Sequence, residues 1–162
     1  MATAIDRAAR EGAAVEKIAA KSRSRCIVDM LHHWRAGKIT GKAPLFASFD
    51  PDLCDEPRKL AVVKADATRS PMRFEFVTSG EDLDNLLGHS LGGAELDVRW
   101  GDGFGSIEES YRRSATTGLP IYDTMRMDFG DGAPEQFERI VLPYSSDGRR
   151  ADRLVAVVVF AR

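Results

Sequence analysis

The segment RLVAVVVF, residues 153–160, is apolar on both of its faces. In an extended strand, successive side chains point to opposite sides of the sheet. One side here carries Leu154, Ala156, Val158 and Phe160, and the other carries Val155, Val157 and Val159. A sheet with one wet face alternates apolar and polar residues, so we expect this strand to be covered on both faces. The preceding segment FERIVLPY, residues 137–144, is also strand-like, and Asp147-Gly148 between the two is typical of a tight turn. The pattern predicts a β-hairpin.

The first 36 residues have a different pattern, rich in Ala, Arg, Lys and Glu with a single Gly, which predicts helix. The polar run at residues 21–25 is consistent with a division into two helices. The strongest apolar face of this helical segment is made of Ile27, Met30, Leu31 and Trp34. This face is the best candidate to cover the second face of the sheet, either within the chain or across a dimer seam. Residues 37–59 contain three prolines and are expected to be a connecting loop.

From residue 60 onward the pattern predicts strands at 60–63, 71–78 and 119–129, in addition to the hairpin. Short helices are predicted at 81–87 and from Ser106 to Thr117, where Ser106 and Glu109 have the spacing of a capping box. Strands interrupted by one helical block indicate an α+β fold with an antiparallel sheet. The predicted organisation is a helical segment at 1–36, a loop at 37–59 and a domain at 60–162.

Five stretches in this order resemble one known family: LHHWRAGK, PLFASFDP, MRFEFVTSGEDLDNLLGHSLGG, YRRSATTGLPIY and FERIVLPYSSDG. They are similar to short bacterial PAS-like proteins with an N-terminal helical segment and a single PAS domain. The chain departs from that pattern at Ser90 and Gly92. The resemblance implies a five-stranded antiparallel sheet with helices on one face, an N-terminal helical extension, and a pocket under the helical block.

Composition narrows the classes of partner. Charged residues make up 30% of the chain and the net charge is only −2, which gives no general attraction to nucleic acid or anionic lipid. The longest apolar stretch is too short to span a membrane, and the N-terminus lacks the pattern of a signal peptide. We therefore expect a cytoplasmic protein. Cys26 and Cys54 lack CxxC spacing and are interpreted as reduced thiols.

No motif supports an enzyme or a cofactor site. Adjacent His32 and His33 point in different directions on a helix and make a poor metal pair. His89 lies in a turn, whereas haem-binding PAS domains usually place the axial His on the helix before the third strand. The segment EDLDNLLGHSLGG lacks the Cys of flavin photosensors. We expect no metal and no cofactor, with haem and flavin disfavoured. Asp123 is the one acidic residue at an inward position of its strand.

The leading hypothesis is a stand-alone sensory or regulatory PAS domain, which binds a small apolar molecule, a protein partner or both, and acts as a homodimer. A ligand-free dimerisation or adaptor module is the alternative, and a small α+β enzyme using Asp123 is the third. Unbranched methionines and aromatic rings make an adaptable pocket wall. The candidate pocket residues are Phe74, Phe76, Trp100, Ile107, Tyr111, Met125, Met127 and Leu142, with Phe129 and Tyr144 also assigned to the inward face.

Overall fold

The structure is a computed structural model that describes residues 3–39, 41–54, 56–129 and 132–161. Its α-helices are α1 (Ala4–Lys21), α2 (Arg25–Ala36), α3 (Glu81–Leu87) and α4 (Phe104–Thr117). Short 3₁₀ helices are η1 (Phe46–Ser48), η2 (Pro51–Leu53), η3 (Pro57–Lys59) and η4 (Val98–Trp100). The strands are β1 (Leu60–Asp66), β2 (Arg73–Thr78), β3 (Ile121–Met127), β4 (Glu135–Tyr144) and β5 (Arg153–Phe160).

The five strands form one antiparallel sheet in the order β2-β1-β5-β4-β3. The last three strands are a meander, and α3, η4 and α4 are inserted between β2 and β3. The hairpin predicted from the sequence is β4–β5, with Tyr144 opposite Arg153 and Phe137 opposite Phe160. This arrangement confirms the α+β, PAS-like fold with an N-terminal helical extension.

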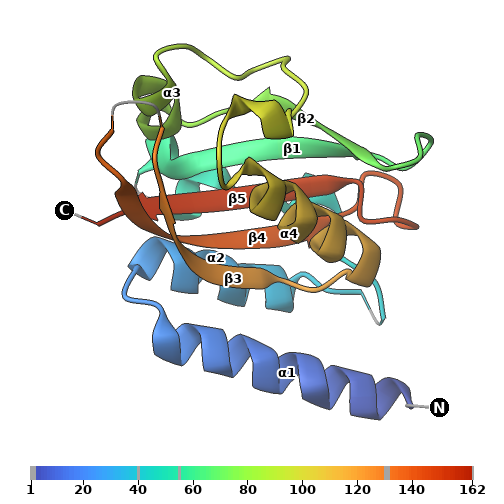
Figure 1. Ribbon diagram of the computed structural model, residues 1–162. Coiled ribbons are helices and arrows are strands. Elements are labelled where there is room, and N and C mark those ends of the chain that lie inside the picture. Colours follow the sequence, from blue (N-terminus) through green and yellow to red (C-terminus); the bar gives the residue numbers. More distant parts are fainter. Residues whose placement is uncertain (1–2, 40, 55, 130–131, 162) are drawn as a thin grey trace.

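The sheet is covered on both faces, as its two-sided apolar strand requires. In Figure 1, α4 lies on one side of the sheet and α2 on the other, with α1 outside α2. We call the α4 side the inner face and the α2 side the outer face. Leu154 and Ala156 of β5 belong to the inner core, and Val155 and Val157 belong to the outer core. Two apolar cores therefore share one sheet.

Helix α2 seals the outer face with four side chains that have no exposed surface. Ile27, Met30, Leu31 and Trp34 pack in one cluster with residues of β4 and β5. The Trp34 Nε1–H donates a hydrogen bond of 2.6 Å to the backbone carbonyl of Pro143. Burial of one such apolar side chain contributes roughly 1.5–3 kcal/mol, so these contacts suffice to hold the helix within its own chain.

Helix α1 is attached more loosely. Among its described residues only Gly12 and Val15 are buried. Two ion pairs connect it to the end of α2 and beyond: Arg35 to Glu16 at 3.2 Å, and Lys38 to Glu11. Most of its residues are exposed, and the helix lies outside α2 (Figure 1).

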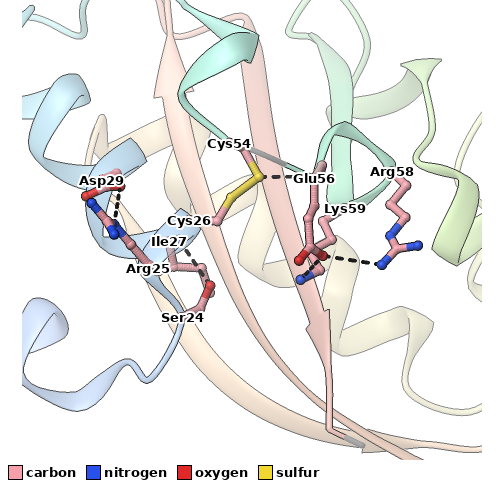
Figure 2. Close-up of a disulfide and its surroundings, with 9 residues drawn as sticks. All are labelled: Ser24, Arg25, Cys26, Ile27, Asp29, Cys54, Glu56, Arg58 and Lys59. Atoms are coloured by element: carbon pink, nitrogen blue, oxygen red, sulfur yellow. Dashed lines mark hydrogen bonds and ion pairs between the residues drawn. A yellow bond between two sulfur atoms is a disulfide. The ribbon is translucent and has the colours of Figure 1, made fainter.

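A disulfide joins Cys26 in the first turn of α2 to Cys54, just after η2, with 4.9 Å between their Cα atoms (Figure 2). The interpretation of these cysteines as reduced thiols was therefore wrong. Their separation of 28 residues in the sequence gives no sign of pairing. The fold brings them together because α2 and the 3₁₀ segments both pack on the outer face.

The start of α4 also differs from the prediction. The helix begins at Phe104, and its N-cap is Gly103, which makes no side-chain capping bond. Gly103 has a φ of +94°, and a Cβ there would lie 2.9 Å from Cγ of Met127. The capping box at Ser106 and Glu109 is not used, because the earlier start buries Phe104 in the inner core.

Candidate functional site

Aromatic side chains fill the inner face between the sheet and the helical block. A series of rings crosses it, in which successive ring centroids are 5.4–6.3 Å apart. In order these are Phe76, Trp100, Phe104, Phe129, Phe137 and Phe160. Phe74 and Tyr111 form a separate pair with edge-to-face geometry, 5.7 Å apart. The layer offers flat apolar surfaces to any occupant, which would have to displace these contacts.

Most of the candidate pocket residues are brought together here. The buried members of the inner core include Phe74, Phe76, Ile107, Tyr111 and Met127. Met125 and Phe129 are partly buried against the same cluster. Trp100 lies at the margin with 36% of its surface exposed.

Leu142 and Tyr144 do not belong to this set, and their assignment to the inward face was wrong. Both lie in the outer core. Side chains alternate along β4, so Phe137 and Val141 face α4 while Leu142 and Tyr144 face the opposite side.

Among the described residues of the inner face, the one buried charged side chain is Arg139 of β4, which is 1% exposed. Its Nε and Nη2 donate to the two carboxylate oxygens of Asp123, at 3.1 and 2.7 Å. Nη2 also donates to the Ser110 hydroxyl of α4 at 2.7 Å. The guanidinium carbon is 5.7 Å from the centre of the Tyr111 ring. Arg139 thus connects β3, β4 and α4 at one point of the inner layer.

One nitrogen of this guanidinium lacks a hydrogen-bond partner in the part of the chain that the structure describes. Nη1 of Arg139 is buried and makes no hydrogen bond among the described residues. Buried donors in proteins are almost always paired, and an unpaired one costs about 1–3 kcal/mol or more when charged. Burial raises the pKa of the neighbouring Tyr111 phenol, and the positive charge of Arg139 acts in the opposite direction and lowers it by a smaller amount. Tyr111 therefore stays a neutral wall of this site.

Sequence reasoning singled out Asp123 and missed its partner. In the β3–β4 ladder Asp123 lies directly opposite Arg139. The alternation along residues 137–141 already assigns Arg139 to the same side as Phe137 and Val141. That signal was available, but the charged residue was not considered as part of an apolar face.

The histidines lie away from the inner core. His89 is exposed and contacts only the Ser90 carbonyl in its own turn, at 3.1 Å. His33 Nε2 is 2.9 Å from the Ser48 carbonyl, and His32 is exposed. Within the described ranges, no group of three or more His, Cys, Asp or Glu side chains is arranged to hold a metal ion. In the same part of the chain, no helix combines the length and apolar character needed to cross a membrane.

A second concave feature lies on the outer face, a groove of about 620 Å³ that we call the outer groove. It lies between the α1–α2 connection, the segment around η2 and η3, and the strands β3 to β5. In its wall the Tyr122 hydroxyl donates to Glu138 Oε2 at 2.7 Å, and the Ser22 hydroxyl donates to the same oxygen at 3.2 Å. Burial, and then the bond to Glu138, raises the pKa of Tyr122 to about 12.

No protein-family model matches the chain, and no curated protein does. Solved structures with a similar fold include several light-oxygen-voltage domains. One, described with a flavin analogue, is 14% identical with a TM-score of 0.46, over 64% of this chain and 78% of that one. A fungal photoreceptor domain is 14% identical with a TM-score of 0.43, over 64% and 74%. An RNA-binding receptor is 18% identical with a TM-score of 0.45, and 75% of this chain matches 36% of its length.

These neighbours contradict one expectation, that of no cofactor with flavin disfavoured. The solved structures named above are light-oxygen-voltage domains, and the first is described with a flavin analogue. The expectation that disfavoured flavin was therefore wrong. It rested on the missing Cys of one photosensor motif, which concerns covalent chemistry and not binding.

Proposed function

We propose that this chain is a sensory or regulatory PAS-like domain that binds a small molecule between the inner face and α4. The observation that carries the proposal is the unpaired Nη1 of Arg139, a buried donor among aromatic side chains. A ligand with a carbonyl or similar acceptor would satisfy it. Because Asp123 already balances the charge of Arg139, the expected ligand is neutral at that point and largely apolar elsewhere.

Strand β4, which carries Arg139, could transmit the effect of a bound ligand to the N-terminal helices. Arg139 faces α4, whereas its neighbours Ile140 and Leu142 pack in the outer core with α2. A ligand that separates Arg139 from Ser110 would shift β4, and β4 contacts α2 directly. We propose that α1 and α2 present this change to a protein partner, as expected for a domain that signals through its terminal helices.

Native mass spectrometry of the protein purified from cells tests the binding proposal. A non-covalent ligand retained near one per chain is expected, and its mass distinguishes a flavin from other small molecules. Arg139→Met keeps an unbranched apolar stem and removes the donor, so it should lower ligand occupancy at least tenfold. Arg126→Met, at an exposed position of β3, is the matched control and should leave occupancy unchanged. Retention of the ligand by Arg139→Met would contradict the proposal.

The alternative function is a ligand-free adaptor module. The close ring packing of the inner face favours it, since those side chains already contact one another. Substitution of Met125 by Trp separates the two functions. In an adaptor with a full core the larger side chain destabilises the fold by about 1–3 kcal/mol, whereas in a binding domain it occupies ligand space and blocks binding.

We also propose a homodimer, a cytoplasmic location and no catalytic role. The exposed surface of α1, with Ile5 at 81% exposure, supports an intermolecular contact. Engagement of Asp123 by Arg139 leaves it poorly suited to act as a general base. Light scattering tests the dimer, and cell fractionation tests the location.

A further inference from the structure

The two sulfur atoms of the disulfide differ in accessibility. Cys26 is partly exposed and lines the outer groove, whereas Cys54 is 2% exposed. A reagent in the groove therefore reaches the Cys26 sulfur first. A groove of about 620 Å³ is within the size range of sites for small organic molecules.

The charges that line the outer groove favour the binding of an anionic small molecule. Its cationic residues are Lys21, Arg23, Arg25 and Lys59, and its acidic residues are Asp29, Glu56 and Glu138. Arg25 pairs with Asp29 at 3.5 Å, and Lys59 pairs with Glu56 (Figure 2). Glu138 is held by two neutral hydroxyl donors.

Lys21 and Arg23 complete this charge balance. Across the described chain, neither makes an ion pair with an acidic side chain. Two cations on the groove wall are thus available to the carboxylates of a small molecule.

The surroundings of Cys54 also accommodate a reduced sulfur. Its Sγ lies 3.4 Å from the backbone carbonyl of Glu56 (Figure 2). A disulfide sulfur has no proton to donate to that oxygen. A Cys54 thiol, in contrast, would find a hydrogen-bond acceptor in place without any movement of the backbone.

From these features we propose that Cys26–Cys54 is a thiol–disulfide exchange site for an anionic low-molecular-weight thiol that enters the outer groove. The thiolate attacks Cys26 Sγ, forming a mixed disulfide on Cys26 and expelling the Cys54 thiolate, which takes up a proton. A second thiolate attacks the small-molecule sulfur of the mixed disulfide and expels the Cys26 thiolate, which takes up a proton. The two small thiols have then given two electrons to the protein disulfide and leave as their oxidised dimer. The site lies on the face opposite Arg139 and is independent of any ligand there.

The consequence is local release of the outer layer. The disulfide is the covalent connection between α2 and the segment around η2. Exchange frees that segment, while Ile27, Met30, Leu31 and Trp34 keep α2 on the sheet. The surface beside the groove therefore changes with the thiol redox state, and the fold does not.

The anionic probe is reduced glutathione. Cysteamine, a thiol that carries a positive charge, is compared with it at equal thiolate concentration. Acid-quenched samples of the full chain are analysed by intact mass and peptide mapping. We expect the first adduct on Cys26. The double variant Lys21→Ala/Arg23→Ala should react with glutathione on the order of 10-fold more slowly, with no loss of rate toward cysteamine. Arg7→Ala/Arg10→Ala, two exposed positions of α1, is the matched control with the same charge change and should react like the parent chain.

Three results would overturn the proposal. The first is an initial adduct on Cys54, and the second is equal glutathione rates for the two double variants. If Lys21→Ala/Arg23→Ala unfolds, as judged by circular dichroism, the single variant Arg23→Gln replaces it, with an expected decrease of about threefold. The third concerns protein isolated with two free thiols: oxidised glutathione must then form the Cys26 adduct followed by the internal disulfide, and failure to do so refutes the exchange site.

Discussion

At the scale of single residues, Arg139 depends on Asp123 and Ser110 to compensate for its removal from water. We predict that Asp123→Asn destabilises the protein by about 3–5 kcal/mol, because it leaves a buried cation without a counter-charge. The double variant Asp123→Leu/Arg139→Met, which removes the pair, should cost less than Asp123→Asn alone. Urea unfolding measures both. A double variant less stable than the single one would show that the pair itself stabilises the fold.

Tyrosine protonation gives a second prediction at this scale. Burial raises the pKa of Tyr111 and Tyr144, and burial with the Glu138 bond raises that of Tyr122 to about 12, from an ordinary value of 10.0. The native state therefore keeps these protons to higher pH than the unfolded chain does. The resulting stabilisation is complete below pH 10 and is lost as the pH rises from 10 toward 12.

Phenolate absorbance and circular dichroism, followed together, check this dependence. We expect phenolate to appear late and together with unfolding. Tyr122→Phe should make stability less dependent on pH in this window. Full ionisation of all three tyrosines near pH 10 in the folded protein would contradict the prediction.

At the scale of elements, the disulfide links α2 to the segment around η2 across 28 residues. We predict that Cys26→Ser/Cys54→Ser lowers the free energy of unfolding by about 3 kcal/mol, because the unfolded chain loses a cross-link. Thermal unfolding without reductant measures the loss. The parent chain in excess dithiothreitol should unfold at the temperature of the double variant, and a difference between them would show that the serines themselves disturb the packing.

The elements themselves were largely predictable from hydrophobic pattern. The two apolar faces of residues 153–160 and the face of Ile27, Met30, Leu31 and Trp34 are local signals, and both faces are covered in the fold. What failed depends on contacts between distant residues. To predict the Cys26–Cys54 disulfide, one must know how the segment around η2 packs on α2. The cluster around Arg139 is recognised only when the packing of β3, β4 and α4 is known.

One misassignment was not of this kind. Leu142 and Tyr144 were placed inward because their neighbours in sequence are apolar, although strict alternation from Phe137 assigns them to the outer face. When both faces of a strand are apolar, hydrophobicity does not reveal which side a residue occupies. Counting positions from a residue of known orientation does.

At the scale of the whole molecule, the sheet, α2 and α1 form successive layers that contribute unequally to stability. The sheet is shared by both cores, so each face needs its own cover, and α2 is the cover of the outer face. Helix α1 packs on α2 and buries only Gly12 and Val15 among its described residues. The two N-terminal helices should therefore differ sharply in their importance for stability, although they are adjacent in sequence.

Two truncations test this difference. Removal of residues 1–21 takes away α1 and leaves α2 with its Ser24 cap, so we predict a folded protein with a modest decrease in melting temperature. Removal of residues 1–36 uncovers the side chains of Ile140, Leu142, Val155 and Val157 on the outer face and should cause aggregation. Size-exclusion chromatography with light scattering, together with thermal unfolding, compares the two. If the chain without residues 1–36 stays soluble, does not aggregate and is as heat-stable as the full protein, the outer face does not need α2. In that case the two-sided apolar pattern of β5 must have another explanation.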